Sequence, residues 1–181
     1  NIIDCLYEED SNWNPIVLHR PVEKELIQKL YTLKAEAAYR PIYGNIKGSD
    51  YSLFKNNLPT INYLQQDLTK ILSNYFDSEI YITESFFNII IPKDGIGGGS
   101  KVHNHLSRID KLPQNNAANQ KFSLVYYLST GDKNSENQGI LKFYDPNTSL
   151  LPEEGMIVIF PASKFHSVYY DGKKDRVVIV F

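Results

Sequence analysis

A series of short β-branched and aromatic runs in the second half of the chain limits its fold more than any other feature. Turn formers separate these runs, in clusters over residues 92–95, 145–147, 152–155 and 171–172. No helical periodicity lies between them, so the pattern indicates an antiparallel sandwich or open barrel. We expect its strands over residues 80–91, 102–105, 122–128, 140–144, 156–160, 167–170 and 176–181.

Helical periodicity dominates the first half. Apolar residues recur at steps of three and four over residues 21–38 and 59–75, which predicts two amphipathic helices. Each has a proline near its start, Pro21 or Pro59, where the missing N–H costs little. Residues 39–58 should form an irregular connection. At about 100–200 residues per domain, we expect one domain over 1–181, with a helical part over 1–78 packed on a β core over 79–181.

Charge and composition exclude several classes of protein. The 19 basic and 21 acidic residues give a formal charge of −2, which favours neither nucleic acid nor anionic membrane as a partner. No apolar run approaches the ~18–20 residues of a membrane span, and the N-terminal residues do not resemble a signal peptide. Cys5, the single cysteine, cannot form an intramolecular disulfide. We therefore expect a cytoplasmic protein, whose oligomeric state the sequence leaves open.

Three of the four histidines lie in the β half and suggest a metal site. His103 and His105 would point to one face of a strand, because side chains alternate along β structure. His166 begins a later strand that an antiparallel barrel can bring alongside. Imidazole nitrogen suits iron, zinc, copper and nickel. His19, by contrast, is expected to be an ordinary surface or core residue.

Arg176 follows His166 by ten residues across a turn at Gly172. A hairpin there would return the arginine to the adjacent strand, near the metal but further from it than the histidines. Its guanidinium can bind a carboxylate through two parallel hydrogen bonds. A metal with open positions and an arginine at this spacing would suit a dicarboxylic keto acid. The glycines at 97–99 should form a flexible tip, because the Lys-Ser/Thr of a phosphate loop is missing.

Residues 84–181 resemble the iron(II)- and 2-oxoglutarate-dependent oxygenases, particularly a bacterial and phage branch with a His-x-His motif. The likeness is carried by the order and spacing of several segments: Phe86-Phe87-Asn88-Ile89, His103-Asn104-His105, residues 122–128 with Tyr126-Tyr127, residues 141–146, residues 152–161 before His166, and residues 175–181. It implies a double-stranded β-helix, which is a jelly-roll or cupin-like barrel. It also implies iron(II), 2-oxoglutarate as co-substrate, O2 and a hydroxylase reaction.

The resemblance further implies roles for single residues. His103 and His166 match the proximal and distal metal ligands, and Arg176 matches the residue that binds the far carboxylate of 2-oxoglutarate. Tyr127 stands where a tyrosine often hydrogen-bonds that co-substrate, and Asn88 is a candidate for the pocket wall. Two positions depart from the family pattern. His105 replaces the usual Asp or Glu, and Val178 replaces a common Ser or Thr.

The departure at His105 leaves alternatives open. Either His105 is itself a ligand in a three-histidine site, or a carboxylate such as Asp110 or Glu84 completes the site. A three-histidine cupin-like protein, as a dioxygenase without 2-oxoglutarate or as a binding module, is therefore the main alternative function. A sugar-binding β-sandwich is a further alternative, and only the abundant tyrosines support it. The loop over 106–121 could cover a substrate, whose identity as a small molecule or peptide the sequence does not reveal.

Overall fold

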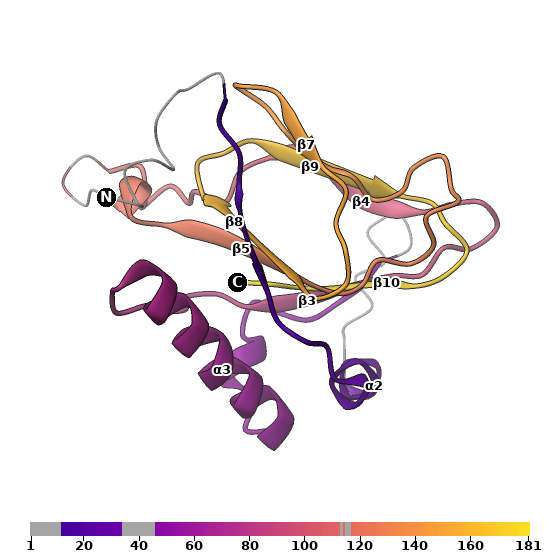
Figure 1. Cartoon of the computed structure of the whole chain (residues 1–181), viewed down its shortest axis with the longest axis horizontal. Coiled ribbons are helices and arrows are strands. Elements are labelled where there is room, and N and C mark those ends of the chain that lie inside the picture. Colours follow the sequence, from indigo (N-terminus) through magenta and orange to yellow (C-terminus); the bar gives the residue numbers. More distant parts are fainter. Residues whose placement is uncertain (1–11, 34–45, 113, 115–116) are drawn as a thin grey trace.

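Two antiparallel sheets face each other in the computed structural model, which describes residues 12–33, 46–112, 114 and 117–181 (Figure 1). The larger sheet has six strands, in the order β1 (Ile16–His19), β8 (Met156–Pro161), β5 (Phe122–Ser129), β10 (Arg176–Val180), β3 (Phe86–Ile90) and β2 (Ile46–Gly48). The smaller has four, in the order β4 (Gly98–His103), β9 (His166–Tyr170), β6 (Leu141–Phe143) and β7 (Thr148–Leu150). The predicted mainly β class is confirmed.

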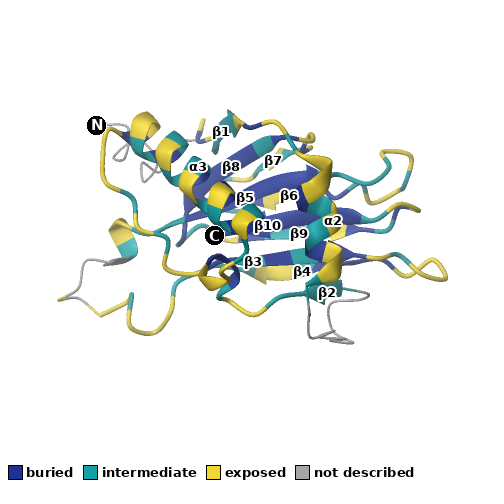
Figure 2. Ribbon diagram, turned by 90° about the horizontal axis from the view of Figure 1, so that it is seen from below, coloured by how far each residue is buried: buried dark blue, intermediate teal, exposed yellow. Residues whose placement is uncertain are grey.

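Both faces of the larger sheet are covered, which explains why β10 is buried along its whole length. Val178 and Val180 point between the sheets, into a cluster with aromatic and aliphatic side chains of β5, β6 and β8. Val177 and Ile179 point the other way, toward the helices. Figure 2 shows two of these helices, α2 (Lys24–Thr32) and α3 (Pro59–Phe76), lying across the sheet. The short 3-10 helix η1 (Leu53–Lys55) contacts α3.

The longer helix follows its sequence pattern closely. α3 begins at Pro59 and buries one stripe of residues at steps of three and four: Ile61, Leu64, Leu68, Leu72 and Phe76. The last buried position is Phe76 rather than Tyr75, the residue at which the predicted helix ends, and Phe76 stacks on Phe122 with ring centroids 5.5 Å apart. The described part of the chain contains no helix that is long and apolar enough to cross a membrane.

α2 begins later than predicted, at Lys24 rather than near Pro21. The carbonyl of Pro21 accepts hydrogen bonds from the Arg20 guanidinium and the Tyr126 hydroxyl. These bonds take the place of the hydrogen bond that this carbonyl would accept in a helical turn. The expected end of this helix, residues 34–38, lies outside the described residues, as do residues 39–45 and Cys5.

The first half was predicted to contain helices and an irregular connection over residues 39–58, but it also contributes two strands. β1 and β2 form the two edges of the larger sheet, beside β8 and β3 respectively. In the second half, β7 has no predicted counterpart, and the strand expected over 80–91 is reduced to the five residues of β3. Strands of three or four residues are too short to show a periodicity of their own.

The glycine run at 97–99 is not a flexible tip, because Gly98 and Gly99 open β4 and pair with β9. A Cβ added to Gly99 would lie 2.0 Å from the carbonyl oxygen of Val168, and one added to Gly97 would lie 1.9 Å from that of Tyr170. Glycine is therefore required here for the close approach of two backbones. This contact fixes β4 against β9, the two strands that carry metal-ligand candidates.

A buried arginine joins β1 to both helices. The Arg20 side chain is 4% exposed, and its guanidinium binds Glu23 at 2.7 Å and Asp67 of α3 at 2.6 Å. It also donates to the hydroxyl of Tyr126 at 3.0 Å. Sequence patterns did not predict this cluster, because Asp67 and Tyr126 lie 47 and 106 residues after Arg20 along the chain.

Candidate metal and co-substrate site

Three histidines meet where β4 ends against β9. His103 closes β4 directly opposite His166, the first residue of β9. His105 lies two residues beyond the strand, where its backbone N–H donates to the carbonyl of Ala162 at 2.8 Å. One ring nitrogen of each histidine lies within 4.8 Å of the others. The expected shared strand for His103 and His105 is wrong, but the expected convergence of all three rings is present.

Backbone carbonyls orient two of the rings. His103 Nδ1 donates to the carbonyl of Lys101 at 2.7 Å, and His166 Nδ1 donates to that of Lys164 at 3.0 Å. A carbonyl can only accept, so the proton sits on Nδ1 and the Nε2 lone pair is left to bind a metal. His105 Nε2 lies 3.1 Å from His166 Nε2. Two nitrogens at about 2.1 Å from one ion, at a right angle, lie about 3 Å apart, so this spacing fits a shared ligand sphere.

Burial keeps the rings of His105 and His166 neutral. His166 is 4% exposed and packs edge-on against Phe160, with ring centroids 4.7 Å apart. Burial lowers the pKa of His166 to about 3. Burial, with smaller contributions from the charges of His103 and Lys121, lowers the pKa of His105 to about 4. Uncharged imidazole is the form that binds a metal ion.

No carboxylate joins the histidines in the described part of the chain. Asp110, one of the two acids considered for this role, instead binds Lys121 at 3.1 Å and accepts from the backbone N–H of Ser107 at 2.7 Å. Glu84, the other, is exposed just before β3. Of the two ways to complete the site, the geometry therefore favours three histidines.

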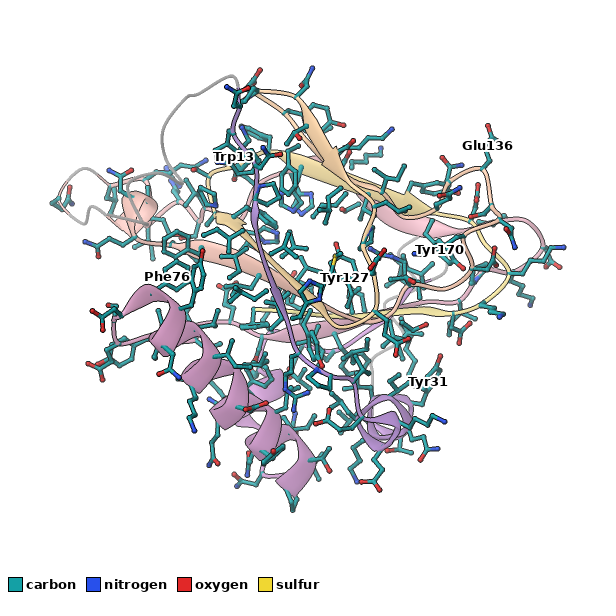
Figure 3. All side chains as sticks on the ribbon, viewed as in Figure 1. Trp13, Tyr31, Phe76, Tyr127, Glu136 and Tyr170 are labelled. Atoms are coloured by element: carbon teal, nitrogen blue, oxygen red, sulfur yellow. The ribbon has the colours of Figure 1, made fainter. Side chains whose placement is uncertain are left out.

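Arg176 lies inside the barrel on the larger sheet. It is 3% exposed, and its Cζ lies 5.2 Å from the ring centroid of Tyr127. Figure 3 shows Tyr127 between the two sheets. The expected hairpin is wrong: β9 and β10 belong to opposite sheets, so the turn after Tyr170 carries the chain across the barrel. The arginine thus faces the metal-ligand candidates from the opposite wall.

The two polar side chains on this wall are incompletely satisfied. Arg176 Nε and the Tyr127 hydroxyl are buried without a hydrogen-bond partner among the described residues. Burial lowers the pKa of Arg176 and raises that of Tyr127, while their proximity opposes both shifts. A buried cation is costly unless an anion pairs with it. A carboxylate bound between the sheets would supply the missing partner, which fits one end of 2-oxoglutarate.

The two remaining predicted positions flank this wall. Asn88 pairs with Val178 across β3 and β10 and is half-buried. Val178 belongs to the apolar cluster between the sheets, so it offers no hydroxyl to a carboxylate. The structure brings both close to Arg176 in the sheet, but their part in binding remains a prediction.

Sequence reasoning missed an aromatic neighbour of the site. Trp13 is buried and meets Phe143 edge-on at 5.1 Å, and Phe143 lies 6.4 Å from the ring of His166. The ammonium of Lys164 lies 4.4 Å from the Trp13 ring. In the sequence, Trp13 stood out only as the single tryptophan.

A separate groove of about 830 Å³ lies on the outer face of the smaller sheet and does not include the histidines. Lys142, which lines it, alternates with the buried Leu141 and Phe143 and so points away from the barrel interior. The chemistry described above therefore concerns the interior and not this groove.

Comparison with known proteins relates the second half of the chain to a known family. The model of the 2OG-Fe(II) oxygenase superfamily matches residues 93–181, a segment that contains all three histidines, Tyr127 and Arg176. No curated protein sequence matches the chain significantly.

Solved structures share the fold over nearly the whole chain. A Pseudomonas putida prolyl-4-hydroxylase is 13% identical, with a TM-score of 0.62, over 99% of this chain and 97% of its own. A Burkholderia pseudomallei oxidoreductase of the 2OG-Fe(II) oxygenase family is 14% identical, with a TM-score of 0.61, over 92% and 83%. The viral collagen prolyl hydroxylase of Paramecium bursaria Chlorella virus-1 is 12% identical, with a TM-score of 0.62, over 93% and 94%.

At these identities the likeness concerns the fold, and it confirms the expected double-stranded β-helix. The family match adds the sequence evidence, because it spans every residue assigned to the metal and co-substrate except Asn88. The chain therefore belongs to the 2OG-Fe(II) oxygenase superfamily, enzymes that use iron(II), 2-oxoglutarate and O2.

Proposed function

We propose that His103, His105 and His166 hold iron(II), and that Arg176 and Tyr127 bind the far carboxylate of 2-oxoglutarate. The observation that carries this proposal is the buried Arg176, which has no acidic partner among the described residues and faces the same interior as the histidines. When bound, iron(II) and 2-oxoglutarate supply an oxidation by O2 in which 2-oxoglutarate becomes succinate and carbon dioxide and the substrate is hydroxylated.

The protein's own contribution is to orient the ligands and exclude water. The carbonyls of Lys101 and Lys164 fix two rings with their Nε2 lone pairs free. Phe143 and Phe160 place apolar surface beside His166. A charge pair between a guanidinium and a carboxylate is stronger in such surroundings than in water.

As substrate we propose a prolyl residue of a peptide, processed in the cytoplasm. Two of the solved structures with this fold are described as prolyl hydroxylases, which supports this choice over a small metabolite. The single cysteine agrees with a reducing compartment. A panel of proline-containing peptides and free amino acids, analysed by mass spectrometry for addition of one oxygen atom, tests the substrate. Oxidation of free amino acids alone would contradict the peptide choice.

The cofactor assignment is tested by anaerobic titration of the iron(II)-loaded protein with 2-oxoglutarate. We expect a weak charge-transfer band in the visible region that is absent from His166→Ala and much weaker in Arg176→Met. Exposed Lys173 provides a matched control, because Lys173→Met also removes one positive charge. That control should leave the band unchanged.

Two results would contradict the proposal in different ways. If iron(II) binds but millimolar 2-oxoglutarate gives no band, the three-histidine alternative without this co-substrate is favoured. If iron(II) does not bind to the wild-type protein, the histidine cluster has only a structural role.

A further inference from the structure

The connection between β5 and β6 packs directly against Arg176. Gly139, near the end of this connection, has a φ of +76°, and a Cβ added there would lie 2.8 Å from Arg176 Nε and 3.2 Å from Arg176 Cδ. A distance of 2.8 Å is too short for a Cβ, so any side chain at position 139 would require either the backbone or the arginine to move. The missing side chain of Gly139 thus leaves the space in which the end of Arg176 lies.

Hydrogen bonds hold the backbone on this side of the contact. Gly139 N–H donates to the carbonyl of Tyr169 at 3.1 Å, and Asp171 N–H donates to the carbonyl of Asn137 at 3.1 Å. The Asp171 carboxylate in turn accepts the backbone N–H of Asn137 at 3.1 Å and its side-chain amide at 2.6 Å. Because the connection is fixed to the end of β9 in this way, a side chain at position 139 would displace the flexible end of the arginine rather than the backbone.

The position of the arginine matters for the role proposed above. Its Nε is buried and has no hydrogen-bond partner among the described residues, and its Cζ lies 5.2 Å from the ring centroid of Tyr127. A guanidinium binds a carboxylate through two parallel hydrogen bonds, which require a defined orientation of both groups. A displacement of about 1 Å is enough to weaken a site of this kind.

We infer that Gly139 is a positioning residue, whose lack of a side chain keeps open the place from which Arg176 binds the far carboxylate of 2-oxoglutarate. The inference rests on the function proposed above. The close contact of Gly139 is with Arg176, which lies on the sheet opposite His103 and His166. A change at position 139 should therefore affect one end of the co-substrate and leave the metal end unchanged.

A comparison of two keto acids tests this inference. 2-Oxobutyrate has the keto acid end of 2-oxoglutarate but lacks the far carboxylate. Isothermal titration calorimetry measures the binding of each acid to cobalt(II)-loaded wild type, Gly139→Ala and Gly95→Ala. Gly139→Ala should bind 2-oxoglutarate at least about tenfold more weakly than wild type does, the scale of one lost hydrogen bond to a charged group. Its affinities for 2-oxobutyrate and for cobalt(II) should be those of wild type.

Gly95→Ala is the matched control for backbone strain. Gly95 has nearly the same φ, +75°, but a Cβ there would meet nothing within 4 Å. This variant should bind both keto acids as wild type does. If Gly139→Ala does not fold, Gly139→Asn takes its place, because asparagine adopts a left-handed φ more readily and carries the same Cβ.

Two results would overturn the inference. Equal affinities of the Gly139 and Gly95 variants for 2-oxoglutarate would show that position 139 does not position the arginine. Parallel losses of 2-oxoglutarate and 2-oxobutyrate binding would assign the effect to the metal end or to the fold as a whole. A wild-type protein that binds 2-oxoglutarate no more tightly than 2-oxobutyrate would instead contradict the function proposed for Arg176.

Discussion

Arg176 illustrates at the scale of one residue how a proposed binding role can oppose stability. Its charge is buried between the sheets, and the structure describes no acidic partner for it. Replacing buried charge by a well-packed apolar side chain often stabilises a protein. Together with the unpartnered Nε, this fits the proposed role of Arg176 as the group that binds a carboxylate of 2-oxoglutarate.

We expect Arg176→Met to unfold at a higher temperature than the wild-type protein when neither metal nor 2-oxoglutarate is present. A gain of about 1 kcal/mol, a cautious value for removing buried charge, corresponds to about 2–4 °C for a chain of this length. Differential scanning calorimetry measures this. Lys173→Met, on the surface, should change little. A lower unfolding temperature for Arg176→Met would show that the guanidinium is already satisfied inside the free protein.

Strand β4 shows at the scale of one element how a glycine fixes the geometry of a site. Gly99 approaches the backbone of β9 so closely that a Cβ would lie 2.0 Å from the carbonyl oxygen of Val168. Further along the same two strands, beyond a shift in register after Ser100, His103 lies opposite His166. Spreading these strands apart would separate two of the three ligand candidates.

We predict that Gly99→Ala loses about 3 kcal/mol or more of stability, the upper range for overpacking, and loses metal binding. Gly95→Ala is the comparison, because its Cβ would meet nothing within 4 Å and only its φ of +75° is unfavourable. That change should cost about 1–2 kcal/mol and leave metal affinity intact. Urea unfolding and cobalt(II) titration measure the two effects. Equal losses in both variants would contradict the close-approach argument.

The elements also show which features a single sequence could predict. The sequence predicted long periodic segments such as α3 and strands with continuous apolar residues such as β5 and β10. These elements are buried in a way that produces a local pattern of apolar residues. β1, β2 and β7 were missed because three or four residues carry no period. Their strand conformation depends on partners distant in the chain.

The convergence of the three histidines was predictable from the sequence, but the way in which they converge was not. His103 and His166 were assigned correctly to neighbouring strands, and the resemblance placed Arg176. The position of His105 beyond β4 depends on a backbone bond to Ala162, and no local pattern encodes that bond. Likewise, the crossing from β9 to β10 looked like a hairpin because a glycine turn separates two apolar strands, whichever sheets they join.

At the scale of the molecule, one ion-pair cluster ties the helical layer to the barrel. Arg20 hydrogen-bonds Glu23, which lowers the pKa of that carboxyl below its ordinary value of 4.5. A lowered native pKa means that the pair stabilises the protein above about pH 4.5 and ceases to do so as the pH falls through the native value. The cluster therefore contributes to acid unfolding.

We expect Glu23→Gln to be less stable than wild type at pH 7, with the difference shrinking toward zero below pH 4. The effect should be modest, because Glu23 is 46% exposed. Chemical unfolding between pH 3 and pH 7 measures it, with Glu25→Gln on the exposed side of α2 as the control. A difference that stays constant with pH would assign the loss to packing rather than to charge.

The metal candidates and Arg176 lie on opposite sheets, so a bound co-substrate would connect the two walls of the barrel. A ligand that binds only the folded state at 100 times its Kd stabilises it by about 2.7 kcal/mol. We predict that 2-oxoglutarate raises the unfolding temperature strongly when cobalt(II) is present and little when it is absent. Glutarate has both carboxylates but lacks the keto oxygen that chelates a metal, so its effect should not depend on cobalt(II). If the shifts from cobalt(II) and 2-oxoglutarate simply add, the two ligands occupy independent sites and do not bridge the sheets.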